Sequence, residues 1–273
     1  MNGRKAIAGL CMLCALLTSA VAAQSASAIS GTTVVTCKEG AGDTGGQTFA
    51  GAHCIPGESA GKYGHYKIAQ DTTTELIGRG GTEFMKLKAT LGGVATTFTS
   101  TSISGSGTVE NKVDPNGEHY VHAQTTGIFE GVTVSPYTKC FVYTDDGTGS
   151  PGAKGVIDTQ ELTTTSTGQG HFVKYTPAAG EVLARFWVLD KNKVGAGGEC
   201  TIQGTYTVTG SVKGVPNGAT FVFTHAATTE QNTLKIGAGA SIKAGVEGSI
   251  TMESREKGGG AFQPLGVTTY STE

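Results

Sequence analysis

The sequence predicts an all-β protein, and three features of the chain lead to that fold class. Runs that alternate apolar and polar residues recur along it, which is the period expected of half-buried strands. The 43 glycines among 273 residues, with abundant Thr and Ser, suit short strands joined by tight turns. No segment after the N-terminal leader shows sustained helical periodicity. We expect an antiparallel β-sandwich, with a closed or partly closed β-barrel as the alternative, since both hide strand edges.

Residues 1–28 are predicted to be a secretory signal peptide, an N-terminal signal helix outside the fold. Arg4 and Lys5 make a basic start, Ile7 to Leu17 form an apolar core, and Ala26-Ser27-Ala28 is a small-residue cleavage site. The apolar core is well short of the roughly 20 residues that span a bilayer, which disfavours a membrane anchor. We expect a secreted, extracellular protein whose mature residues, 29–273, form a single β-sandwich domain.

The mature chain is mildly acidic. Removal of Arg4 and Lys5 with the leader leaves 18 basic and 22 acidic residues, a formal net charge of −4. Such a chain offers no basic surface to nucleic acid or anionic lipid, so we expect no nucleic-acid partner. It also lacks a second long apolar run, so we expect no membrane span after signal cleavage.

The cysteines of the mature chain predict disulfide bonds. An even number of cysteines in an exported protein favours disulfides over reactive thiols. The four cysteines of the mature chain can pair in three ways. We favour the pairing in which the first bond closes a Gly-rich loop and the second joins the starts of two strands. Each bond is expected to contribute about 3 kcal/mol. Zinc binding is disfavoured because no CxxC pair occurs. The favoured pairs are Cys37–Cys54 and Cys140–Cys200.

The clearest strands lie between Phe172 and Phe223. Residues 182–189 are rich in aromatic and β-branched side chains and contain the only Trp of the chain. After a hydrophilic loop, residues 201–210 alternate, with apolar side chains on one face and threonines on the other. The turn Val215-Pro216-Asn217-Gly218 leads to a third strand at 219–223. We expect these strands to form an antiparallel meander.

Weaker strand patterns fill the rest of the mature chain. The hairpin signal Leu91-Gly92-Gly93-Val94 and the turn Asp114-Pro115-Asn116-Gly117 separate several of them. Residues 145–155 are the best linker candidate, but a domain boundary there would place Cys140 and Cys200 on opposite sides of it. Turn spacing predicts about fifteen strands. The remaining ones are expected at 31–36, 63–68, 74–77, 84–91, 94–103, 108–109, 119–129, 132–134, 234–236, 248–253 and 265–270.

Turn glycines, cysteines and strand alternation combine into several motifs by which the chain resembles other proteins. The motifs are Val132-x-Val134-x-Pro136-x-x-x-Cys140-x-Val142, Gly168-x-Gly170-x-Phe172, Cys200 with Gly204-x-Tyr206-x-Val208-Thr209-Gly210, and Leu234-Lys235-Ile236-Gly237. With them the chain, from Thr36 to Met252, resembles an uncharacterised family of exported bacterial all-β proteins. The resemblance implies an exported β fold with cysteines that hold it together, and it carries over no catalytic or ligand residue.

Two motifs match the sequence patterns of hydrolytic active sites but lack the neighbouring secondary structure or the partner motif that such sites require. Gly57-Glu58-Ser59-Ala60-Gly61 has the pattern of a nucleophile elbow, which requires a preceding strand and a following helix. No helical pattern follows it, so a loop serine is the better interpretation. Asp43-Thr44-Gly45 is half of an aspartic-protease site, and no second D-T-G occurs to share the proton. We therefore predict no catalytic residues.

No metal or cofactor site is predicted. His119 and His122 are three residues apart, which places them on opposite faces of a strand. Asp145-Asp146-Gly147 offers oxygen ligands for calcium but lacks the alternating loop pattern, so a solvated turn is expected. The other histidines are isolated in the sequence: His53, His65, His171 and His225.

Two functions remain open. The first is a non-enzymatic extracellular or cell-surface protein, binding or structural, that recognises an unknown extracellular protein or polymer through loops or a strand edge. The second is a secreted hydrolase acting on polysaccharide, which would need two carboxylates such as Asp190 and Glu199. A single Trp and 7% aromatic residues provide few platforms for sugar rings. We therefore favour the first function.

Overall fold

The computed structural model describes residues 31–42, 48–55, 61–81, 84–166, 173–191, 198–224, 233–237 and 242–269, which consist of strands, turns and loops. The prediction of an all-β protein is therefore confirmed. No helix in these ranges is long and apolar enough to cross a membrane. The predicted signal peptide, residues 1–28, lies outside the described residues.

The described residues contain 21 strands, more than the sequence predicted, because several are too short to show alternation. The first seven are β1 (Thr32–Glu39), β2 (Thr48–Phe49), β3 (Tyr63–Lys67), β4 (Thr74–Gly80), β5 (Lys86–Leu91), β6 (Val94–Thr99) and β7 (Ser102–Val113). The next seven are β8 (His119–Glu130), β9 (Thr133–Ser135), β10 (Phe141–Asp145), β11 (Pro151–Lys154), β12 (Ile157–Asp158), β13 (Leu162–Thr165) and β14 (Val173–Pro177). The last seven are β15 (Val182–Leu189), β16 (Gly204–Thr209), β17 (Val212–Asn217), β18 (Thr220–Phe223), β19 (Lys235–Gly237), β20 (Ile242–Glu256) and β21 (Gln263–Thr269).

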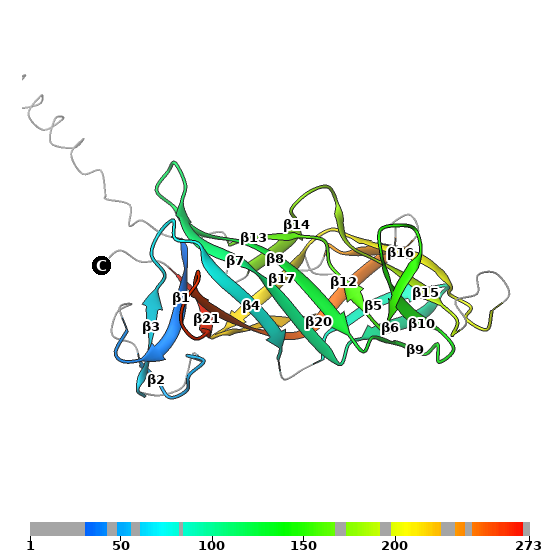
Figure 1. Cartoon of the computed structure of the whole chain (residues 1–273), viewed down its shortest axis with the longest axis horizontal. Helices are drawn as coiled ribbons and strands as arrows, with labels where there is room; N and C mark the ends of the chain where they lie inside the picture. Colours follow the sequence, from blue (N-terminus) through cyan, green and yellow to red (C-terminus); the bar gives the residue numbers. More distant parts are fainter. Residues whose placement is uncertain are drawn as a thin grey trace, which may run out of the picture.

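Eight strands form a closed antiparallel barrel. They pair in the order β4, β7, β8, β13, β14, β17, β18 and β20, and β20 pairs back with β4. Figure 1 shows these strands in the middle of the molecule. Of the two expected architectures, the structure is therefore the barrel and not a plain sandwich. Alternation could not separate them, because the strands of both bury one face.

The 15-residue strand β20 joins this barrel to a second sheet. Its second half pairs with β18 and β4 in the barrel, whereas its first half pairs with β19 and β5. Beyond β19 the second sheet continues through β16, β15, β10 and β11, and beyond β5 through β6 and β9. The barrel and the second sheet follow one another along the long axis of the molecule (Figure 1).

Gly248 lies where β20 changes partners. Its φ of +128° belongs to the region that favours glycine. A Cβ atom at this position would lie 2.6 Å from the carbonyl oxygen of Phe84 and 2.9 Å from the Cα atom of Met85. Because both contacts are with backbone atoms, only glycine fits where the segment before β5 passes over β20.

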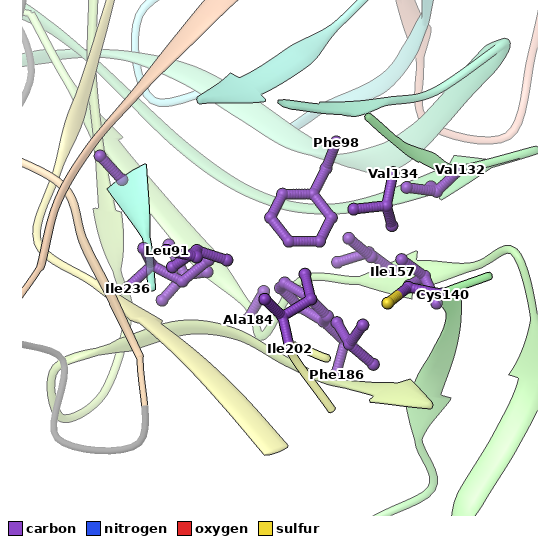
Figure 2. Close-up of a cluster of buried hydrophobic side chains, with 14 of the residues drawn as sticks. Leu91, Phe98, Val132, Val134, Cys140, Ile157, Ala184, Phe186, Ile202 and Ile236 are labelled. Carbon is purple, nitrogen blue, oxygen red and sulfur yellow. The ribbon is translucent and has the colours of Figure 1, made fainter. Parts of the chain in front are cut away.

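Each sheet closes over its own hydrophobic core. In the second-sheet core, the Phe98 ring meets Phe186 edge-on at a centroid distance of 5.3 Å, and Phe186 stacks on Tyr206 at 5.7 Å. Figure 2 shows Phe98 pointing toward Ala184 and Phe186 on the facing strand. Each aromatic pair adds roughly 0.5–1.5 kcal/mol beyond the burial of its area. The barrel core includes Leu76, Ile103, Val109, Val121, Tyr175, Phe221, Phe223 and Met252.

A small third group of strands lies at one end of the molecule, where β1 runs between β21 and β3 (Figure 1). Val34 of β1 packs onto the barrel core. Asn111 of β7, only 4% exposed, takes the place of a strand partner there. Its side-chain carbonyl accepts a hydrogen bond from the Val34 N–H at 2.7 Å, and its amide donates to the carbonyls of Val34 at 3.1 Å and Ile68 at 2.7 Å. The Asn111 side chain therefore links β1 directly to β7 of the barrel.

Both predicted disulfides are present. Cys37 and Cys54, with Cα atoms 5.9 Å apart, form a small separate cluster with Phe49. This bond holds a region whose own hydrophobic content is low, as the sequence predicted. Cys140 and Cys200, with Cα atoms 4.8 Å apart, lie in the second-sheet core just before β10 and β16.

The segment from Phe172 to Phe223 is not one meander, which corrects the sequence prediction. β15 and β16 pair in the second sheet, whereas β14, β17 and β18 belong to the barrel. Pro216, expected in a turn, lies in β17, and the turn follows at 218–219. The proline is tolerated because β17 pairs with β14 only from Val212 to Gly214, so Pro216 has a strand neighbour on one side only. The linker candidate at 145–155 forms a hairpin between β10 and β11.

Candidate functional site

A cavity of about 160 Å³ lies between the two hydrophobic cores. Phe98 and Phe186 of the second-sheet core line it, and so do Ile103 and Met252 of the barrel core. Its surface is almost entirely apolar. Side chains ordinarily fill the interior of an eight-stranded barrel, so a space of this size needs a structural cause.

Three glycines that lie side by side across the barrel wall provide that cause. Gly78 of β4 is directly opposite Gly105 of β7, and Gly105 is directly opposite Gly127 of β8. Gly78 lies two residues after Leu76, and Gly105 lies two residues after Ile103, so these glycines are on the same strand faces as two side chains of the barrel core. Three neighbouring strands therefore present bare backbone to the interior at one level of the barrel.

The glycines differ in what a side chain would meet. A Cβ atom at Gly105 would lie 2.9 Å from the carbonyl oxygen of Thr126, so the close approach of β7 and β8 requires glycine there. A Cβ atom at Gly127 would meet nothing nearer than Thr159 Cγ2 at 3.6 Å, an ordinary van der Waals contact. Gly127 thus borders space that a larger side chain could occupy.

A second cavity of about 20 Å³ adjoins the first, and Leu76, Thr125, Tyr175 and Met252 line both. Thr164 lines the smaller cavity, is 4% exposed, and its hydroxyl has no hydrogen-bond partner among the described residues. Burial raises the pKa of the Tyr175 phenol, which therefore stays neutral. The site is an apolar chamber with polar groups at one side.

Charge is nearly absent from this chamber. Of the described residues that line the larger cavity only Lys86 is charged, and its ammonium group lies 3.5 Å from the carboxylate of Glu247. A charged ligand would lose its hydration without gaining a free counter-ion. The chamber is therefore suited to an uncharged molecule.

Several residues with possible chemistry lie outside the part of the chain that the structure describes. Ser59 of the elbow-like motif and Asp43 of the D-T-G motif lie outside the described residues, as do His171 and His225. Among the residues that the structure describes, no group of three or more His, Cys, Asp or Glu side chains could hold a metal ion.

The two histidines of β8 lie on opposite faces of the strand, as predicted, because β8 pairs with β7 without interruption. Burial, and then the charge of Lys67, lowers the pKa of His119. The Nε2 atom of His122 lies 3.4 Å from the hydroxyl of Thr163 on the neighbouring strand. Neither histidine lines the cavity.

The acidic residues considered for catalysis or calcium binding differ in burial and in contacts. The Tyr143 hydroxyl donates to the backbone carbonyl of the buried Asp190 at 3.3 Å, whereas the exposed Glu199 pairs with Lys139 at 3.3 Å. The carboxylate of Asp146 accepts from the N–H of Thr148 at 2.8 Å and thereby holds its own loop, which is the turn that the sequence predicted.

No residue that lines the cavity was assigned a functional role from the sequence. A glycine inside a strand marks a close approach or a missing side chain. Only Gly127 lies inside a predicted strand, 119–129, whereas Gly78 and Gly105 lie just beyond the strands predicted at 74–77 and 94–103. Their alignment depends on the pairing and register of β4, β7 and β8, and alternation does not determine which strands pair.

The chain matches none of the protein-family models, curated proteins or solved structures with which it was compared. The geometry of the cavity is therefore the basis for its interpretation.

Proposed function

We propose that the chain is an exported, non-enzymatic binding protein that holds a small, uncharged, apolar molecule inside the molecule, between its two cores. The apolar cavity of about 160 Å³ carries this proposal. Cavities of roughly 150 Å³ lined by Leu, Ile and Phe stay dry and bind ligands of the size of benzene. Met85 and Met252 also line the cavity, and their unbranched side chains can adapt to the shape of a ligand.

Two lines of support favour an extracellular location. Residues 1–28 have the pattern of a signal peptide, and the resemblance to exported bacterial all-β proteins agrees with it. The two disulfides fit an oxidising compartment, where such bonds persist. In that setting, binding inside the protein would keep an apolar molecule out of water.

Toluene is the probe that tests the proposal. The oxidised mature chain, residues 29–273, is titrated with toluene by calorimetry, and its thermal unfolding is followed with and without the ligand. At ten times Kd, binding to the folded state adds about 1.4 kcal/mol. For a chain of this length, that stabilisation raises Tm by about 3–6 °C. We expect one toluene per chain.

Two glycine-to-leucine variants locate the binding. Gly127→Leu places a side chain in the cavity and should weaken toluene binding by at least about tenfold, since the ligand loses most of its contacts. Gly259→Leu makes the same change in an exposed turn, where a Cβ atom meets nothing within 4 Å, and should leave binding unchanged. Absence of toluene binding to the natural chain, or equal affinity of both variants, would refute the proposal.

A further inference from the structure

We infer that the ligand carries one uncharged hydrogen-bonding group, a hydroxyl or a carbonyl, that pairs with the hydroxyl of Thr164. The inference rests on the proposed function and specifies its ligand class. Thr164 of β13 is paired with Ala123 of β8 and with Tyr175 of β14, so it lies in the wall of the closed barrel. Buried polar groups are nearly always hydrogen-bonded, and the Thr164 hydroxyl has no partner among the described residues.

The smaller cavity has room for one polar group. Its volume of about 20 Å³ is slightly above the roughly 10–15 Å³ that one water-sized probe occupies. The larger cavity, with its apolar lining, can hold a ring. Because Leu76, Thr125, Tyr175 and Met252 line both, the two cavities are neighbours, and a ring in the larger one can direct a substituent toward the smaller one.

The lining also sets the charge of this group. None of the described residues that line the smaller cavity is charged, so a carboxylate or an ammonium there would be buried without a counter-ion. Thr164 can donate to a carbonyl or accept from a hydroxyl, and the neutral phenol of Tyr175 lies in the same wall. The ligand class is therefore a compact apolar molecule with a single neutral polar substituent, for which phenol is the simplest probe.

Three probes and three variants of the mature chain test this assignment by calorimetry. The natural chain should bind toluene and phenol but not benzoate. Thr164→Val keeps the shape of the side chain and removes the hydroxyl, so it should weaken phenol binding about fivefold and toluene binding less than about twofold. Thr164→Ser retains the hydroxyl and should retain the phenol affinity. Thr90→Val, at an exposed position of β5, should alter neither affinity.

The outcomes separate this inference from the proposed function. If toluene binds and Thr164→Val leaves the affinity for phenol unchanged, the role of Thr164 is wrong and the cavity still binds. Binding of benzoate as tight as that of phenol overturns the neutral ligand class. If neither toluene nor phenol binds, both proposals fail. Thr164→Val should fold at least as well as the natural chain, because it removes an unpaired hydroxyl, and thermal unfolding checks this.

Discussion

Replacing Asn111 with leucine should weaken the attachment of β1 to the barrel while nearly keeping the size of the side chain. The change removes three hydrogen bonds, two to Val34 and one to Ile68. The Val34 carbonyl keeps a bond from the Ile68 N–H at 3.3 Å, so the Val34 N–H and the Ile68 carbonyl are the groups left unpaired. Each costs roughly 1–3 kcal/mol when buried. We expect a loss of about 3 kcal/mol in the free energy of unfolding.

Urea denaturation followed by circular dichroism measures this loss, which corresponds to a fall in Tm of about 6–12 °C. Asn116→Leu is the matched control, because Asn116 lies in an exposed turn and its hydrogen bonds to other described residues are with Asp114 of the same turn. Hydrogen exchange at the Val34 amide gives a local reading and should accelerate in Asn111→Leu alone. If both variants unfold within about 0.5 kcal/mol of each other, Asn111 does not act as the partner of β1.

Three further predictions follow from the core, the disulfides and one ion-pair group. Phe186→Ala should cost about 3–5 kcal/mol in guanidinium unfolding, whereas Phe84→Ala, at a side chain 59% exposed, should cost less than about 0.5 kcal/mol; similar costs would contradict the packing described. Loss of the Cys140–Cys200 bond, which spans 60 residues, should cost about 4 kcal/mol against about 3 for Cys37–Cys54, which spans 17, when Cys→Ser pairs are unfolded in urea; the reverse order would contradict the loop argument. Hydrogen bonding to Lys88 and the charges of Lys88 and Lys86 lower the pKa of Glu247 from its ordinary value of 4.5. The ionised carboxylate therefore stabilises the fold above pH 4.5, and this stabilisation is lost as the pH falls through the lower pKa of the folded state. Glu247→Gln should therefore lose less stability than the natural chain between about pH 6 and pH 3, by under about 1 kcal/mol, and an equal loss would show that the pair contributes nothing.

The sequence was sufficient to predict that the fold consists of strands and which cysteines pair, because alternation and cysteine context are local signals. It did not specify the closed ring, which exists only because β20 pairs with β4 on one side and β18 on the other. It also placed Pro216 in a turn, since a proline in a strand is acceptable only where a neighbour is missing, and missing neighbours are a tertiary property.

The candidate site was even less predictable from the sequence than the fold. Gly127 lies inside a predicted strand and Gly78 and Gly105 just beyond two others, and only the register of β4, β7 and β8 shows that the three lie in one row. Thr164 resembles many other threonines of the chain, and only its burial without a partner distinguishes it. Both features arise from contacts between segments distant in sequence, which composition and periodicity do not report.

The long separation in sequence between β4 and β20 also determines when the protein can assemble. Arg255 of β20 bonds to Glu75 of β4, 180 residues earlier, so the barrel cannot close until β20 is available. The first half of the same strand completes the second sheet, which must wait as well. Such long-range closure is slow, since loop entropy is lost before the contacts form. A chain that emerges gradually from a pore would remain without its closing strand, and hence open, until β20 passes through.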